Sequence, residues 1–243
     1  MQISKRLTAV SGLITPGCRL ADVGTDHGYI PIKLVLSGRI PSAIAMDVNQ
    51  GPLERARAHI REYHLETQIT ARLSDGLEQL SPGEADSVLI AGMGGMLTVR
   101  ILKNGKAVLK QVKELILQPQ SDIREVRLFL QEEGFRIAEE DMVEEDGKFY
   151  PMMRAVPDGG KKEELSELQL LYGPCLLSGK HPVLLRYLEH ERGLLERVQN
   201  KLSREETQGA LQRREEIAQS LWMNEQAGCR ITCSESADHP AEP

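Results

Sequence analysis

The stretch that most constrains the fold of this chain is LADVGTDHGYIP, residues 20–31. A short apolar run ends in a turn that contains Gly24 and Gly28, and a helix-like pattern follows. We therefore expect a strand, a tight turn and a helix N-terminus, which directs free backbone N–H groups toward a ligand above the strand. The two glycines permit a positive φ and a close approach of that ligand to the backbone. Asp22 and Asp26 would repel a pyrophosphate, and would attract a ligand that carries a cationic group and hydroxyls.

Apolar extended runs alternate with helical patterns through the first 157 residues. An amphipathic stripe at residues 3–14 precedes the first strand, and the segment 96–113 is helical in pattern with a break at Asn104-Gly105. Two extended runs meet near Asp146-Gly147, which indicates a hairpin. This order predicts an α/β fold with a Rossmann-like, mostly parallel sheet, an antiparallel terminal hairpin and helices on both faces. The parallel strands are expected at residues 20–24, 43–47, 68–73, 87–91 and 114–117.

The segment Pro157 to Gly160 is the best domain boundary in the chain. We predict a ligand-binding sheet domain at residues 1–157, a helical, coiled-coil-like domain at 161–223 and a disordered polar tail at 224–243. The helical domain is expected to hold an antiparallel helix pair with a turn within residues 203–209. Its near-heptad seam comprises Leu184, Leu188, Leu195, Val198 and Leu202, faced by Leu211, Ala218 and Leu221.

Composition restricts the class of protein. The 243 residues are 40% hydrophobic and 27% charged, as in soluble globular proteins. The chain lacks both a signal-peptide pattern and an apolar run near the roughly 20 residues that span a bilayer. We interpret its cysteines as free thiols of a cytoplasmic protein without a metal site, and we favour a monomer. They are Cys18, Cys175, Cys229 and Cys233.

The net charge of −6 argues against a globally basic surface for nucleic acid. The charges are segregated, however, because residues 87–113 contain no acidic side chain. A local basic face therefore remains available for a polyanion. Motifs of serine hydrolases, zinc proteases and P-loop enzymes are absent. The basic residues of this segment are Arg100, Lys103, Lys106, Lys110 and Lys113.

Polar or glycine-containing turns follow four of the predicted strands. Ligands of doubly wound sheets bind at the carboxyl ends of the strands, so the four turns outline one pocket. Asp47 lies 19 residues beyond Gly28, the position from which a carboxylate grips ribose hydroxyls. The turns are 22–28, residue 47, Ser74-Asp75-Gly76 and 92–95.

The ligand favoured for this pocket is S-adenosylmethionine (SAM) over NAD. A nicotinamide site usually has a glycine where this chain has Asp26, because the backbone must approach a dianionic pyrophosphate. SAM carries no phosphate. Asp22 or Asp26 would attract its ammonium group, Gly24 and its neighbours suit its methionyl part, Asp47 its ribose and Asp75 its adenine amino group.

The chain resembles one bacterial family in the motifs DVGTDHGYIP, SDG and IAGMGG, and further in QPQ-S, KFYP and YGP. This family is the tRNA (adenine-N1)-methyltransferases that act at position 22 of tRNA, the TrmK type. The resemblance covers about residues 1–223 and implies a class I SAM-dependent methyltransferase that forms 1-methyladenosine in tRNA. It also implies a C-terminal helical extension. Two departures from the general class I pattern are Asp26 in place of a glycine and the lack of an N-P-P-Y-type motif after the fourth strand.

The lack of that motif agrees with the chemistry. Adenine N1 has an in-plane lone pair at neutral pH, so the enzyme needs to align N1, carbon and sulfur without removing a proton. A carboxylate would stabilise the cationic product, and Asp26, with Tyr29, is the catalytic candidate. The segment 92–95 would give a wall poor in side chains for the target base, which must be exposed or flipped.

Two further functions remain open from the residues alone. One is methylation of a protein or small molecule, with the helical domain as a partner-binding module, and the other is a SAM- or nucleotide-binding sensor without catalysis. The predicted cofactor-binding residues are Asp22, Gly24, Thr25, His27, Gly28, Asp47, Val48, Asp75, Gly76, Ala91, Gly92, Met93 and Gly94. The predicted tRNA-binding residues are Gly95, Arg100, Lys103, Lys106 and Lys110.

Overall fold

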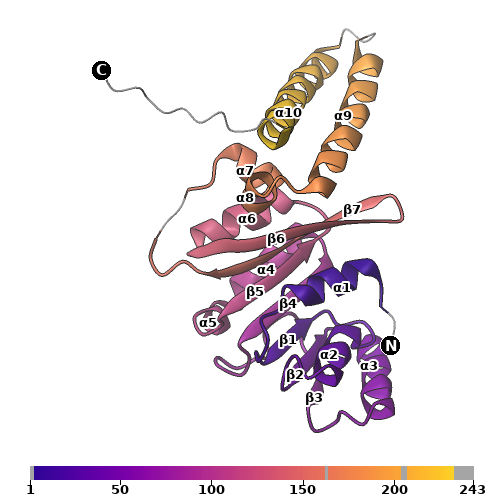
Figure 1. Ribbon diagram of the computed structural model, residues 1–243, viewed down its shortest axis with the longest axis vertical. Coiled ribbons are helices and arrows are strands. Elements are labelled where there is room, and N and C mark those ends of the chain that lie inside the picture. The colour runs from indigo at the N-terminus through magenta and orange to yellow at the C-terminus, as the bar shows by residue number, and fades with distance from the viewer. Residues whose placement is uncertain (1–2, 162–163, 204–206, 233–243) are drawn as a thin grey trace. The chain divides into compact units, whose positions relative to one another are not determined.

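Seven strands of the described chain form one sheet in the order β3-β2-β1-β4-β5-β7-β6 (Figure 1). The computed structural model describes residues 3–161, 164–203 and 207–232. β1 to β5 run parallel, whereas β7 is antiparallel to both β5 and β6. This arrangement confirms the predicted fold class. The strands are β1 (Leu20–Val23), β2 (Ala43–Asp47), β3 (Ile69–Leu73), β4 (Ser87–Met93), β5 (Glu114–Pro119), β6 (Phe135–Glu145) and β7 (Lys148–Pro157).

Helices cover both faces of this sheet, as predicted. The break expected at Asn104-Gly105 is present, because α4 ends at Asn104 and α5 begins at Lys106. Asp122 precedes α6 with a φ of 49°, and its side chain makes no capping hydrogen bond. The helices are α1 (Lys5–Gly12), α2 (Tyr29–Leu36), α3 (Gln50–Glu62), α4 (Gly95–Asn104), α5 (Lys106–Leu109), α6 (Ile123–Glu132) and α7 (Glu167–Tyr172).

The hairpin of β6 and β7 turns at Asp146-Gly147, as the sequence predicts. Both residues have a positive φ, 51° and 69°. Two consecutive left-handed residues are the signature of the type I′ turn, whose twist matches that of the flanking strands. The turn places Glu145 and Tyr150 on either side of the hairpin end.

The chain divides into two units, Met1–Leu171 and Tyr172–Pro243, so the first unit extends past the predicted end at 157. A buried guanidinium explains the difference. Arg127 on α6 is 1% exposed, donates to Glu140 at 3.0 Å, and donates to the carbonyls of Leu170 and Leu171 at 2.8 and 2.9 Å. It thereby attaches α7 to the first unit.

The second unit contains the predicted helix pair, α9 (Pro182–Leu202) and α10 (Gln208–Thr232), preceded by α8 (Pro174–Ser178). The predicted start of a tail at residue 224 is wrong, because α10 continues to Thr232. Residues 233–243, with Cys233, lie outside the described residues. Within the described chain, Cys18, Cys175 and Cys229 form no disulfide bond.

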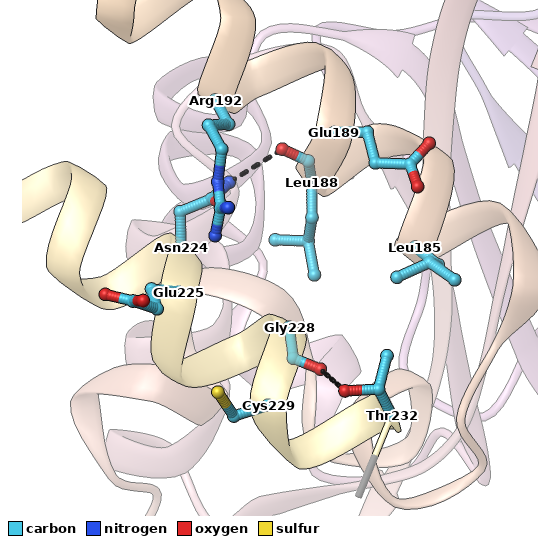
Figure 2. A pocket seen from close by; sticks show the side chains of 9 residues that line it. All are labelled: Leu185, Leu188, Glu189, Arg192, Asn224, Glu225, Gly228, Cys229 and Thr232. Carbon is cyan, nitrogen blue, oxygen red and sulfur yellow. Dashed lines mark hydrogen bonds between the residues drawn. The ribbon is translucent and has the colours of Figure 1, made fainter.

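The seam of this helix pair differs from the predicted one, because it lies one position earlier on α10 and because Val198 on α9 is 40% exposed. Leu184 and Leu188 are buried as expected, but Leu211 is 50% exposed. Buried residues recur every seven positions along α10, and one of them, Asn224, is polar. A search for apolar residues at helical spacing therefore could not find this face. Asn224 donates to the carbonyl of Leu188 at 2.9 Å (Figure 2). The buried residues of α10 are Ala210, Ile217, Asn224, Ala227 and Ile231.

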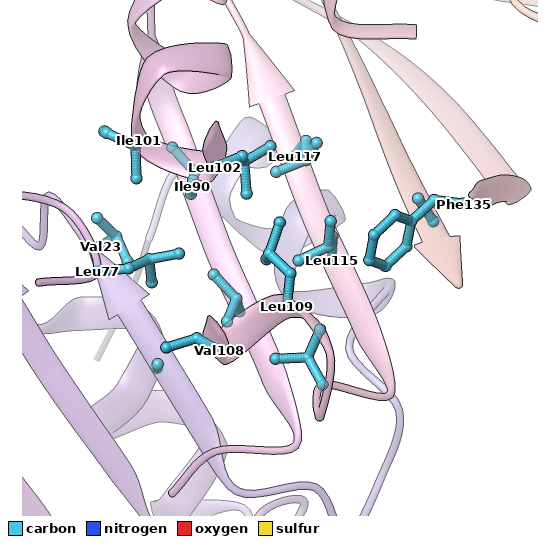
Figure 3. Close-up of a cluster of buried hydrophobic side chains, with 14 of the residues drawn as sticks. Val23, Leu77, Ile90, Ile101, Leu102, Val108, Leu109, Leu115, Leu117 and Phe135 are labelled. Carbon is cyan, nitrogen blue, oxygen red and sulfur yellow. The ribbon is translucent and has the colours of Figure 1, made fainter. Parts of the chain in front are cut away.

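The sheet of the first unit separates two clusters of buried apolar side chains. Val88 and Ile90 of β4 face α4 and α5, and Leu89 between them faces α1 and α2. Figure 3 shows the first cluster, in which Leu102 and Leu109 lie over β4 and β5. Because both faces are covered, a ligand can reach this sheet only at the ends of its strands or at its edges. No helix of the described residues is long and apolar enough to cross a membrane.

Candidate active site

The turn after β1 has the strand–turn–helix form that the sequence predicts. Gly24, His27 and Gly28 have φ values of 75°, 64° and 69°. The N–H groups of Gly24 and Thr25 both donate to the carbonyl of Met46 at 2.8 Å, which attaches the turn to β2. A Cβ atom on Gly24 would overlap the side chain of Met93 on β4. The positive φ therefore favours glycine here, whereas the overlap involves only the flexible end of the Met93 side chain.

Asp22 is a buried carboxyl group at the end of β1. It is 7% exposed, and its Oδ2 accepts a hydrogen bond of 2.6 Å from the hydroxyl of Thr25. Burial raises the pKa of Asp22 to about 6, the bond from Thr25 opposes the shift, and the charge of Asp47 adds to it. No basic side chain of the described residues forms an ion pair with Asp22. The site therefore provides an uncompensated anion that suits a cationic ligand group.

A hollow of about 190 Å³ opens above this carboxyl group. Six predicted site residues line it together, from the β1 turn, the start of α2 and the end of β4. Three residues that the sequence reasoning missed complete the lining, and two of them come from α1. The predicted residues are Asp22, Gly24, Thr25, Asp26, Tyr29 and Ala91, and the missed ones are Arg6, Leu7 and Ile30.

Asp26 and His27 form the outer part of the turn. The Asp26 side chain is 65% exposed and pairs with Arg55 at 2.9 Å and with His27 at 3.4 Å. His27 does not line the hollow. Its ring stacks on Tyr29, with ring centroids 5.0 Å apart, and both rings stack on His59. His27 Nδ1 is buried without a partner among the described residues.

The ends of β2 and β3 continue the site beside the hollow. Asp47 accepts a hydrogen bond of 2.7 Å from the N–H of Asn49. Val48, directly after β2, is 57% exposed, and Leu73, at the end of the neighbouring strand β3, is 44% exposed. Two apolar side chains are therefore exposed at neighbouring strand ends. The turn that contains Asp75 and Gly76 follows β3. The predicted residues Asp47, Val48, Asp75 and Gly76 lie at the carboxyl ends of the strands, as the hollow does, but they do not line it.

The segment 92–95 spans the end of β4 and the start of α4, and its glycines have different constraints. Gly92 has a φ of 80°, which favours glycine, and a Cβ atom there would lie at an ordinary contact distance of 3.5 Å from Nη1 of Arg6. Gly95 is buried, and its Cβ atom would overlap the carbonyl oxygen of Ser121. Close packing of two backbone segments explains why residue 95 is a glycine better than contact with a substrate does. Gly92, Met93 and Gly94 are half-buried at the edge of the sheet.

The basic residues of α4, α5 and the following turn are exposed, but not all carry an uncompensated charge. Lys106 pairs with Glu133 at 2.6 Å, and Lys113 pairs with Asp86 at 3.1 Å. Lys103 lies over the ring of Phe129, 5.9 Å from its centroid. Arg100, Lys103 and Lys110 form no ion pair with a described residue, and they are the stronger part of the predicted basic face.

Arg6 carried no sequence signal that connects it with the site. It lies in an amphipathic helix at the N-terminus, and its partners are Gln118 on β5 and Tyr150 on β7. The QPQ and KFYP motifs contain those partners, so the motifs mark this wall of the hollow only once the fold is known.

Comparison with known proteins places the chain in one family. The model of TrmK, tRNA (adenine(22)-N(1))-methyltransferase, matches residues 20–226. The tRNA (adenine(22)-N(1))-methyltransferase of Bacillus subtilis is 35% identical over 207 residues, which cover 82% of this chain and 86% of the relative.

Solved structures agree. Streptococcus pneumoniae Sp1610 in complex with SAM matches with a TM-score of 0.83 and 34% identity, over 93% of this chain and all of the other. M. capricolum TrmK in complex with S-adenosyl-homocysteine (SAH) matches with a TM-score of 0.83 and 28% identity, over 95% of this chain and all of the other. The chain belongs to the tRNA (adenine(22)-N(1))-methyltransferase family, TrmK.

Proposed function

We propose that this chain transfers the methyl group of SAM to N1 of adenosine 22 in tRNA, at the carboxyl ends of β1 to β4. The observation that carries the proposal is the buried, unpaired carboxyl group of Asp22 below a glycine-containing turn. An ammonium group compensates this carboxylate, whereas a phosphate would be repelled. The relatives solved with SAM and SAH support the same cofactor.

The cofactor would lie along the edge of the sheet. Its amino-acid end occupies the hollow above Asp22, and its ribose hydroxyls reach Asp47 at the end of β2. Val48 and Leu73 are exposed apolar side chains that suit the faces of the adenine. Asp75 would accept from the adenine amino group. The remaining predicted residues shape the turns around it: Thr25, His27, Gly28, Gly76, Ala91, Gly92, Met93 and Gly94.

The reaction requires alignment more than proton transfer. The lone pair of adenine N1 attacks the methyl carbon while the bond from that carbon to the sulfonium breaks, which leaves SAH and a cationic 1-methyladenosine. Holding the reacting atoms in line can supply several kcal/mol of the reduction in the barrier. Asp26 lies at the solvent side of the hollow, where a carboxylate stabilises the developing positive charge on the base. Tyr29 is the other candidate, since its ring also lines the hollow.

The target nucleotide must leave its pairing or tertiary contacts to present N1. The half-buried segment from Gly92 to Gly94 offers a wall with little side-chain bulk, against which the base would lie. Arg100, Lys103 and Lys110 would contact the phosphates of the tRNA. The helix pair of the second unit would make further contacts with the RNA and recognise it by its shape.

Transfer of label from SAM tests this function. Purified protein is incubated with methyl-labelled SAM and total bacterial tRNA, and the nucleosides are separated. We expect the label in 1-methyladenosine. Transfer to a protein or small molecule in place of RNA would support the alternative methyltransferase, and binding of SAM without any transfer would support a sensor.

A further inference from the structure

The side chain of His59 on α3 contacts the outer half of the turn that follows β1, residues 26–29. Its Nδ1 atom lies 2.9 Å from the carbonyl oxygen of His27. A carbonyl oxygen can only accept a hydrogen bond, so Nδ1 of His59 carries the proton and donates. The same ring stacks on the rings of His27 and Tyr29, with centroids 5.4 Å apart in both pairs. One half-buried side chain of α3 therefore contacts two residues of this turn.

This contact occurs where the backbone conformation is unfavourable by itself. His27 and Gly28 have φ values of 64° and 69°, so two consecutive residues adopt the left-handed conformation. Glycine adopts it without steric cost, whereas the Cβ atom of a histidine then lies close to the following carbonyl oxygen. The hydrogen bond from His59 to the carbonyl group of His27 offsets part of this cost. The turn therefore depends on α3 for its conformation as well as on its own sequence.

The inner half of the turn, residues 22–25, has a separate support. The N–H groups of Gly24 and Thr25 donate to the carbonyl of Met46, and the hydroxyl of Thr25 donates to Asp22. These bonds attach the inner half to β2 and to the end of β1. A change at His59 therefore leaves intact the hydrogen bonds that hold the residues beneath the proposed cofactor site.

Tyr29 is the residue through which His59 can affect the reaction. It begins α2, and its side chain lines the hollow. The ring of His27 lies nearly parallel to that of Tyr29, at an interplanar angle of 4° and a centroid separation of 5.0 Å, and the ring of His59 lies at 20°. Neither histidine is among the described residues that line the hollow. The two imidazoles therefore support the tyrosine ring without occupying the space that a ligand would take.

We propose that His59 is a positioning residue for methyl transfer, which acts through Tyr29 and not through binding of SAM; this proposal rests on the proposed function. The hydrogen bond of His59 fixes the carbonyl group of His27 and so the first residue of α2, whose ring limits where the target adenine lies. In-line attack on the methyl carbon tolerates little displacement, since a misplacement of about 1 Å can cost a factor of about 100 in rate. The bond is directional, whereas stacked rings at these separations can slide over each other, so the bond contributes more than the stack.

Three substitutions at position 59 separate the two contacts. His59→Ala removes the ring and the donor, His59→Phe keeps a ring without the donor, and His59→Asn places an amide N–H near the position of Nδ1. We expect kcat, with SAM and tRNA saturating, to fall roughly 10- to 100-fold in His59→Ala and His59→Phe. His59→Asn should stay within about threefold of the wild-type protein. The affinity for SAH, measured by calorimetry, should stay within about twofold in all three variants.

A double-mutant cycle identifies the residue through which His59 acts. Tyr29→Ala alone should lower kcat. His59→Ala added to Tyr29→Ala should lower kcat by less than about twofold more, because the ring that His59 positions is absent. Arg61→Ala, an exposed arginine on the same helix, is the control and should leave kcat and SAH affinity unchanged. Urea unfolding of each variant shows whether the protein is folded under the assay conditions.

Three results would overturn the proposal. The first is an unchanged kcat in His59→Ala, and the second is a fall in SAH affinity as large as the fall in kcat, because His59 would then support the whole turn. The third is a double-mutant cycle in which the two losses multiply, since His59 would then not act through Tyr29. If His59→Ala does not fold, a kcat of His59→Phe at or above that of His59→Asn contradicts the proposal, and the reverse order supports it. Wild-type protein that binds SAH but transfers no methyl group to tRNA would instead contradict the proposed function.

Discussion

The hydroxyl of Thr25 donates a hydrogen bond of 2.6 Å to Oδ2 of Asp22, which links the glycine-containing turn to the end of β1. This bond favours the charged form of a carboxyl group whose pKa burial raises to about 6. An ammonium group in the hollow would favour the charged form further. Ionisation of Asp22 and binding of a cationic ligand are therefore coupled.

We expect the affinity for SAM to rise between pH 5 and pH 7 by about tenfold, because SAM binding requires a charged Asp22 and lowers its pKa. Asp26, Asp47 and Arg6 are the other charged side chains near this carboxyl group. Calorimetry at the two pH values measures the change. The dependence should disappear in Asp22→Asn, and equal affinities for the wild-type protein at both pH values would rule out the coupling.

The same group should reduce stability at neutral pH. Its pKa is higher in the folded than in the unfolded chain, where it is 3.8. The favourable contribution of Asp22 to the free energy of unfolding is present in full below pH 3.8. It is lost as the pH rises through about 6. Asp22→Asn should therefore raise the free energy of unfolding at pH 7 by about 1–3 kcal/mol. Urea unfolding without ligand checks the sign.

Asp26 should affect turnover more than cofactor binding. Its side chain is 65% exposed and paired with Arg55, so solvent screens its effect on bound SAM. We expect Asp26→Asn to lower kcat about tenfold with SAM saturating, because the cationic product loses a nearby carboxylate. Arg55→Ala removes the same ion pair but keeps the carboxylate, and kcat should not fall. An equal loss in both variants would assign the pair a structural role.

Charge reversal should separate the free from the paired lysines of the basic segment. Lys103→Glu should weaken tRNA binding and reduce the slope of log affinity against log salt by about 1. Lys106→Glu should have a smaller effect, because Glu133 already pairs with Lys106. Fluorescence anisotropy with labelled tRNA across a salt series measures both. Unchanged binding in Lys103→Glu would move the RNA surface away from α4.

Two arginines on α6 should differ sharply in their contribution to stability. Arg127 is fully buried and bonded to Glu140 and to the end of α7, whereas Arg124 pairs with Glu167 at the surface. Arg127→Ala removes the buried cation that pairs with the carboxylate of Glu140 and should cost about 3–5 kcal/mol. Arg124→Ala should cost at most about 1 kcal/mol. Thermal unfolding compares the two, and similar losses would contradict the difference in burial.

Neighbouring glycines after β4 give a matched pair. A Cβ atom on Gly95 overlaps the carbonyl oxygen of Ser121, whereas one on Gly94 lies 3.3 Å from the movable hydroxyl of Ser121. Gly95→Ala should destabilise the fold by about 1–3 kcal/mol, with a smaller change for Gly94→Ala. The free energies of unfolding in urea test this. A larger loss for Gly94→Ala would point to a role of its backbone that packing does not explain.

Periodicity predicted the architecture of the first unit because its signals are local. Alternating strands and helices, the break at Asn104-Gly105 and the Asp146-Gly147 turn each depend on a few adjacent residues. The seam of α10 was displaced by one position because Asn224 is a polar residue whose partners lie on α9. The first unit was predicted to end at residue 157 because the sequence alone does not show that Arg127 is buried and bonded to the carbonyl of Leu170.

In the site, too, features that depend on adjacent residues were predictable, and features that depend on distant residues were not. The turn residues of β1 were predictable, since glycines and carboxylates after a strand carry their own signal. Arg6 was not, because three segments far apart in the sequence bring it to the hollow: α1, the end of β5 and the hairpin. The sequence also does not show that Gly95 is needed for packing against Ser121.

The most direct test is the position of the transferred methyl group. Purified protein and labelled SAM are incubated with a tRNA transcript that has adenosine at position 22, and with the same transcript carrying guanosine there. We expect 1-methyladenosine at position 22 of the first transcript and no label in the second. Equal labelling of both transcripts, or no transfer to the adenosine transcript by protein that binds SAM, would contradict the proposed reaction.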